Sequence, residues 1–168
     1  FRSSALAVML TGYSSSAVLL VAGALFLAVA ATVARGDKVA IVLPNCPQHV
    51  AAFYAVQLLG ATVVEHNPLY TAHELEGLFR DHGARVAISW DKTASTLEKL
   101  RSTTPLETIV SVNMVDAMPP LKRLALRLPI PPLAAKREQL TEHAPNTVAW
   151  STLIGSAIGG DGSALEMP

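Results

Sequence analysis

Short apolar runs alternate with amphipathic stretches between residues 38 and 113, and this alternation is the most regular feature of the chain. The predicted strands are residues 38–43 (KVAIVL), 61–65 (ATVVE), 85–90 (RVAISW) and 108–112 (TIVSV). Runs rich in β-branched residues with few polar positions are typical of strands buried on both faces. Because a helix is predicted between each pair, the strands should be parallel with right-handed crossovers. The predicted fold class is α/β: a parallel β-α-β-α-β-α-β core with helices on both faces, preceded by an apolar helix.

The first predicted helix, residues 47–59, has clear start and stop signals. Pro47 suits the first turn, with Asn45 or Cys46 as the cap, and Gly60 suits the left-handed position after the end. Its large apolar side chains cover most of the helix circumference, so we expect them to be buried. These are Val50, Phe53, Tyr54, Val56 and Leu58.

The second predicted helix begins with a turn and a capping box. The residue before Pro68 is pushed out of helical geometry, so Asn67 to Tyr70 should form a turn. Thr71 and Glu74 have the spacing of a capping box, and the helix should end at Gly83. A polar helix over residues 92–101 is predicted to follow the third strand.

The pattern is less clear at both ends. Ala17 to Ala34 is an unbroken apolar run that, as a helix, would rise about 27 Å, near the lower limit for spanning a bilayer. Residues 1–35 are therefore predicted to be an apolar helical segment, either membrane-associated or buried. Later segments have mixed signals: short helices at 121–128 and 134–140, an extended Pro129–Pro132, and a helical turn at 150–154. The Gly/Ser-rich residues 155–168 are predicted to be a flexible linker.

Composition and charge narrow the function classes. Charged residues make up only 15% of the chain and apolar residues 51%, which suggests a protein that buries surface against a partner or touches a membrane. The net charge of zero gives no general attraction to nucleic acid. One basic cluster is predicted to be a solvated helix face. It consists of Lys122, Arg123, Arg127, Lys136 and Arg137.

No residue pattern points to catalysis. The single cysteine, Cys46, excludes a disulfide within the chain, fits a cytoplasmic location and is interpreted as structural. Residues 155–163 are Gly-rich but follow no clear strand, so a phosphate loop is disfavoured. Ser89 and Ser111 lie in predicted strands, outside any nucleophile elbow. The first strand-to-helix turn contains no glycine, which argues against a dinucleotide site.

The five histidines lack metal-ligand spacing, and no metal site is predicted. They are His49, His66, His73, His82 and His143. His66 differs from the others because it follows a strand, and strand ends in such sheets face the ligand crevice.

A series of motifs in fixed order resembles a known family. They are Gly36–Pro47 (GDKVAIVLPNCP), Phe53-Tyr54-Ala55, Leu59-Gly60-Ala61, Asn67–Thr71 with Glu74-Leu75, and Asp81–Ala84. Together they resemble the N-terminal subdomain of adenylate-forming acyl-CoA synthetases, most closely the bacterial long-chain fatty acid–CoA ligases. The resemblance covers about residues 36–154, interpreted as part of that subdomain. Before Gly36 an uncharged stretch departs from the family pattern. Three explanations remain open: a membrane-associating version of the family, an altered upstream reading frame, or a junction with foreign sequence.

The resemblance implies a two-step reaction: ATP and a fatty acid give an acyl-adenylate with Mg²⁺, and coenzyme A then takes the acyl group. The family's catalytic motifs lie beyond the sequence given, so no catalytic, cofactor-binding or metal residue is assigned, and we expect this chain to be inactive alone. A structural family motif is matched by Asn67, Pro68, Tyr70, Thr71 and Glu74. The alternatives are a non-catalytic, membrane-associated α/β module that binds a partner or an acyl chain, and an unrelated flavodoxin-like binding domain.

Overall fold

The computed structural model describes residues 32–126, 128 and 130–159, and a five-stranded parallel sheet forms its centre. The strands are β1 (Lys38–Val42), β2 (Thr62–Glu65), β3 (Val86–Trp90), β4 (Thr108–Val112) and β5 (Val148–Ala149). Their order is β2-β1-β3-β4-β5, and every neighbouring pair is parallel. The α/β class and the four predicted strands are confirmed. Strand β5 was not predicted because two residues are too short for a periodic pattern.

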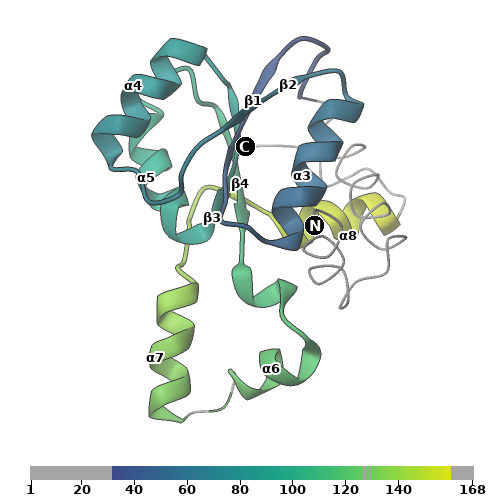
Figure 1. Ribbon diagram of the computed structural model, residues 1–168, viewed down its shortest axis with the longest axis vertical. Coiled ribbons are helices and arrows are strands. Elements are labelled where there is room, and N and C mark those ends of the chain that lie inside the picture. The colour runs from purple at the N-terminus through teal and green to yellow at the C-terminus, as the bar shows by residue number, and fades with distance from the viewer. Residues whose placement is uncertain (1–31, 127, 129, 160–168) are drawn as a thin grey trace, which may run out of the picture.

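Helices cover both faces of the sheet (Figure 1). Helices α3 (Pro47–Leu58) and α8 (Trp150–Gly159) lie on one face, and α4 (Ala72–His82) and α5 (Asp91–Leu100) lie on the other. Strand residues alternate between the two cores: in β1, Val39 and Ile41 pack toward α3, whereas Ala40 and Val42 pack toward α4 and α5. Burial on both faces explains the continuous apolar runs of these strands.

Helix α3 buries its small side chains. Val50, Tyr54 and Leu58 are 37%, 53% and 64% exposed, so the prediction that they are buried was wrong. The buried residues of the helix are Gln48, Ala51, Ala52, Ala55 and Val56. The alanines that face the sheet allow the helix to approach it closely, whereas Val50, Tyr54 and Leu58 point away.

The predicted helix ends are confirmed. The Cys46 Sγ accepts a hydrogen bond from the His49 N–H at 3.4 Å, which makes Cys46 the N-cap of α3. Gly60 follows α3 with φ of 72°, and Gly83 ends α4 with φ of 69°. At the start of α4, Thr71 and Glu74 form the capping box in full.

Between β4 and β5 the chain leaves the sheet. It passes through the short helices η1 (Met114–Ala117) and α6 (Pro120–Ala125), then through α7 (Pro131–Leu140). Figure 1 shows α6 and α7 extending away from the sheet and its covering helices, and residues 119–140 are called the arm below. Pro131 and Pro132 were predicted to be extended but form the first turn of α7, where a backbone N–H has no helical partner to lose.

The predicted apolar helix at the start of the chain lies mostly outside the described residues. Residues 17–31 of the predicted apolar helix lie outside the described residues, and 32–34 are not helical. Val33 is instead 5% exposed in the core beside α3. No helix in the described part of the chain has the length and hydropathy needed to cross a bilayer.

The predicted linker begins too early. Residues 155–159 belong to α8, and 160–168 lie outside the described residues. Trp150 and Leu153 pack against the sheet. Packing of this kind can hold a helix together despite the poor helix propensity of glycine.

Candidate functional site

The carboxyl ends of the strands border two hollows, which are the candidate site. The strand order reverses between β1 and β3, and ligands of open parallel sheets bind at such a reversal. The first hollow lies there and has a volume of about 420 Å³. It is lined by Leu43, Pro44, Asn45, His49, Glu65, His66, Asn67, Pro68, Leu69 and Trp90.

A histidine–carboxylate pair lies in the first hollow. The His49 Nε2 and the Glu65 Oε1 are 2.6 Å apart, with the side chains 20% and 52% exposed. The nearby Cys46 thiol, whose Sγ accepts a hydrogen bond from the His49 N–H, is not an activated nucleophile. Burial raises the pKa of Cys46, which keeps the thiol protonated. Cys46 is therefore a buried helix cap in this structure.

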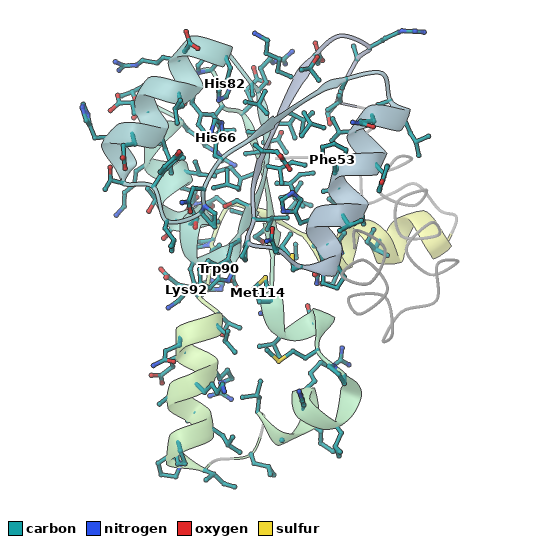
Figure 2. All side chains as sticks on the ribbon, in the orientation of Figure 1. Phe53, His66, His82, Trp90, Lys92 and Met114 are labelled. Atoms are coloured by element: carbon teal, nitrogen blue, oxygen red, sulfur yellow. The ribbon has the colours of Figure 1, made fainter. Side chains whose placement is uncertain are left out.

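His66, which lines this hollow, contacts a second histidine, His82. The rings of His66 and His82 are stacked, with centroids 5.0 Å apart, and their Nε2 atoms are 3.0 Å apart (Figure 2). Since the His82 Nδ1 accepts a hydrogen bond from the Ala84 N–H, its own proton is on Nε2 and is donated to His66. Burial, then the nearby His66, lowers the pKa of His82 to about 4, and burial also lowers the pKa of His66. Both rings are therefore neutral at pH 7.

The family motif builds the loop beside the hollow. The side-chain Oδ1 of Asn67 accepts a hydrogen bond from the Leu69 N–H, and the backbone carbonyl of Asn67 accepts one from the Tyr70 N–H. The Pro68 carbonyl accepts a hydrogen bond from the buried Thr93 hydroxyl at 3.1 Å, which joins the loop to α5.

The remaining motif residues act at the start of α4. The Glu74 carboxylate accepts hydrogen bonds from the Thr71 N–H and hydroxyl, both at 2.7 Å, and these lower the pKa of Glu74. Tyr70 is 40% exposed. The hydrogen bonds of Asn67, Pro68, Thr71 and Glu74 thus fix the turn and the start of α4.

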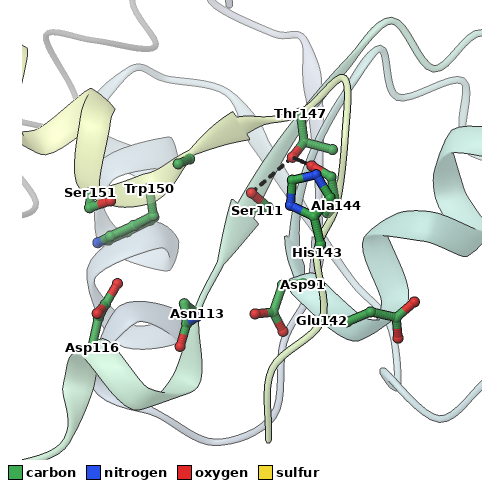
Figure 3. A pocket seen from close by; sticks show the side chains of 11 residues that line it. Asp91, Ser111, Asn113, Asp116, Glu142, His143, Ala144, Thr147, Trp150 and Ser151 are labelled. Atoms are coloured by element: carbon green, nitrogen blue, oxygen red, sulfur yellow. Dashed lines mark hydrogen bonds between the residues drawn. The ribbon is translucent and has the colours of Figure 1, made fainter. Parts of the chain in front are cut away.

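The second hollow has a volume of about 360 Å³ and lies beyond the ends of β3 and β4 (Figure 3). Asp91 follows β3, Asn113 follows β4, and Glu142 and His143 follow α7. Asp91 is 4% exposed, and its carboxylate oxygens make only weak contacts with the backbone N–H groups of Glu142 and Lys92, outside ordinary hydrogen-bond geometry. At the far side, the Thr147 and Ser111 hydroxyls are 2.9 Å apart.

The electrostatics of the second hollow are unfavourable for anions. Burial is the main cause that raises the pKa of Asp91 to about 6, and the Glu142 carboxylate adds to the rise. The backbone N–H groups of Glu142 and Lys92 oppose it in part. Asp91, Asp116 and Glu142 all line the hollow, and ionised carboxylates at these positions repel anions.

Two features of the described residues bear on metal and phosphate binding. Within 32–126, 128 and 130–159 there is no group of three His, Cys, Asp or Glu side chains suited to a metal ion. The Gly-rich segment is helical over residues 155–159, where a phosphate loop would require an open turn between a strand and a helix.

The sequence prediction did not identify the second hollow. Asp91 and Asn113 each directly follow a predicted strand, which is a usable signal for this edge of the sheet. Glu142 and His143 could not be placed, because their position depends on how the arm returns to the sheet.

Comparisons with known proteins agree with the expected family. A family model described as AMP-binding enzyme matches residues 17–150. The match thus includes residues 17–35, which we expected to depart from the family. The long-chain-fatty-acid–CoA ligase of Bacillus subtilis is 40% identical over 85 residues, covering 51% of this chain and 15% of that protein. Its Salmonella typhimurium counterpart is 30% identical over 120 residues, covering 71% and 21%.

A solved structure supports the same grouping. An anthranilate CoA ligase in complex with anthranoyl-AMP has 28% sequence identity and a TM-score of 0.55, covering 57% of this chain and 19% of that chain. The matched region therefore corresponds to about a fifth or less of each of these relatives.

Proposed function

Because the chain belongs to the family of AMP-binding enzymes, we propose that it forms part of the N-terminal subdomain of an ATP-dependent fatty acid–CoA ligase. The parent reaction would convert a fatty acid and ATP to an acyl-adenylate and then transfer the acyl group to coenzyme A. The observation that carries the proposal is the family match over residues 17–150, together with relatives named long-chain-fatty-acid–CoA ligases.

In this proposal the described residues supply scaffold. The turn at Asn67 and Pro68 and the capping box of Thr71 and Glu74 fix the β2–α4 connection beside the first hollow. The acids of the second hollow would repel phosphate and carboxylate groups. ATP, Mg²⁺, the fatty acid and coenzyme A would therefore require residues other than those described, and the chain alone would be inactive.

The inactivity is tested by ATP–pyrophosphate exchange with palmitate. We expect the purified chain to give the same rate as a buffer control, with the intact Bacillus subtilis ligase as the positive control. Exchange above the buffer rate that depends on palmitate would contradict the proposal that the chain is inactive alone.

The family role is tested by a chimera. This chain replaces the aligned segment of the Bacillus subtilis ligase, and palmitate-dependent exchange is measured together with thermal unfolding. We expect a folded chimera to retain exchange, because the replaced segment supplies scaffold. A chimera that unfolds cooperatively near the parent temperature but shows no exchange would refute the proposed role.

A further inference from the structure

The second hollow contains a buried carboxylate that has no counter-ion among the described residues. The side chain of Asp91 lines the hollow, is 4% exposed, and lies between Asn113 and Glu142 in the view of Figure 3. Its oxygens make only weak backbone contacts, and no ion pair among the described residues includes it. A buried charge without a partner is costly, so a cation that enters the hollow would be stabilised there.

The neighbouring lysine does not supply this cation. Lys92 follows Asp91 in the chain, but it is not among the residues that line the hollow and forms no ion pair with Asp91. Of the lining residues, only His143 can carry a positive charge, and its side chain is exposed. The three acids Asp91, Asp116 and Glu142 therefore make the hollow negative at neutral pH.

The size and the lining of the hollow favour an organic cation over a metal ion. Its volume of about 360 Å³ is in the range of small-molecule sites and far above the roughly 30 Å³ of one water molecule. Among the described residues, no three His, Cys, Asp or Glu side chains are arranged to hold a metal ion. Ala144, Ala149 and Trp150 add apolar surface to the lining. Apolar surface beside a buried carboxylate suits an ammonium group that is carried on an alkyl chain.

A second carboxylate lies near Asp91 at the rim of the hollow. The Ser95 hydroxyl donates a hydrogen bond to the Glu142 Oε1 at 3.2 Å, and Glu142 is exposed. The Glu142 carboxylate raises the pKa of Asp91, which shows that the two groups are close enough to repel each other. An ammonium group between them would replace this repulsion by attraction to both.

We propose that the second hollow binds a primary ammonium group on a short alkyl chain, with the buried Asp91 as its counter-ion and Glu142 at the rim. The alkyl chain would lie against the apolar lining that includes Trp150. The inference does not rest on the proposed ligase role, since only residues in and beside the hollow carry it.

The test is titration of the full chain with butylammonium chloride at pH 7.5 and constant ionic strength, followed by the amide chemical shifts in NMR spectra. We expect saturable shifts at Ser111, Thr147 and Ala149, which line the hollow. Asp91→Asn should weaken binding by about ten-fold or more, because the ammonium group loses its charged hydrogen-bond partner. Glu142→Gln should weaken it by only about two- to five-fold, because an exposed ion pair contributes less.

Two controls separate the site from general charge and from apolar binding. Asp81→Asn removes the same charge as Asp91→Asn, at an exposed position of α4 outside the hollow, and should bind like the unchanged chain. Butanol has the same alkyl chain without the charge and should not produce the shifts. Equal binding to Asp91→Asn and the unchanged chain, the same shifts with butanol, or displacement of butylammonium by Mg²⁺ would each overturn the proposal.

The same ammonium group occurs on free amines and on lysine side chains, and a second probe distinguishes these sources. Nα-acetyl-lysine methylamide carries the ammonium group on a peptide backbone. If it binds more tightly than butylammonium and depends equally on Asp91, the site is assigned to a lysine of a partner protein. If it binds more weakly, the site is assigned to a free amine.

Discussion

Replacing Asp91 by asparagine should stabilise this protein at neutral pH and change little at pH 4. Asp91 is almost completely buried, and its pKa is raised from 3.8 to about 6. The folded state therefore holds the proton more tightly than the unfolded state, and stability falls as the pH rises from about 3.8 to about 6. Above that range the full destabilisation is present, and an uncharged asparagine of the same shape should remove it.

The magnitude follows from the two pKa values. A difference of about 2.2 units corresponds to about 3 kcal/mol at pH 7.5 and to about 0.6 kcal/mol at pH 4. The carboxylate lines a hollow that admits water, and screening lowers these figures. We therefore expect a gain of about 1.5–3 kcal/mol at pH 7.5. The wild type and the Asp91→Asn variant share the other charged and titratable groups around the site. These are Lys92, Asp116, Glu142 and His143.

The assay is urea unfolding of both proteins at pH 4 and pH 7.5, followed by the fluorescence of Trp90 and Trp150. The control is Asp116→Asn in the same hollow. Asp116 is exposed, so its replacement should change the free energy of unfolding by less than about 0.5 kcal/mol. If Asp91→Asn has the same effect at both pH values, or destabilises the protein at pH 7.5, the buried carboxylate is not the cause we assign.

Three further changes test the local structure. Thr71→Ala should lower the free energy of unfolding by about 1 kcal/mol in urea titrations, because it removes the capping box, and Thr71→Ser should restore most of the loss. Gly83→Ala should lower the free energy of unfolding by about 1–2 kcal/mol, because the φ of 69° is unfavourable for alanine. No atom lies within 4 Å of the added methyl group, so a clash does not contribute. An unchanged free energy of unfolding would contradict this. Because the pKa of His82 is lowered to about 4, the contribution of His82 to stability should fall as the pH drops from 6.5 toward 4, opposite in sign to that of Asp91. In thermal melts, the stability of the wild type relative to His82→Gln should therefore fall over that range. An unchanged pH dependence would argue against a buried neutral pair.

Much of the fold could be predicted because its signals are local. The buried parallel strands are continuous β-branched runs, and the capping box needs only Thr71 and Glu74 at the right spacing. Gly60 and Gly83 likewise mark helix ends through their own backbone preference.

The predictions that were wrong or missing concern features that depend on contacts between distant parts of the chain. The large apolar residues of α3 are spread around the helix, so the sequence did not indicate which side faces the sheet. In the structure, alanines occupy the sheet-facing positions. Asp91 and Glu142 share a hollow only because the arm returns beside the end of β3, where the Trp90 indole N–H donates to the Leu140 carbonyl at 2.9 Å. No periodic pattern in the sequence encodes that return.

The path of the arm also suggests where this fold tolerates a change of length. The chain leaves the sheet after β4 and re-enters it at β5, and these strands are direct neighbours, with Val110 opposite Val148 and Ser111 opposite Ala149. An excursion that starts and ends at adjacent strands can be shortened or extended without shifting the register of the strands. Doubling its length would add only about 0.6 kcal/mol of closure entropy. Residues 119–140 are thus a natural position for inserting a reporter domain while the sheet stays intact.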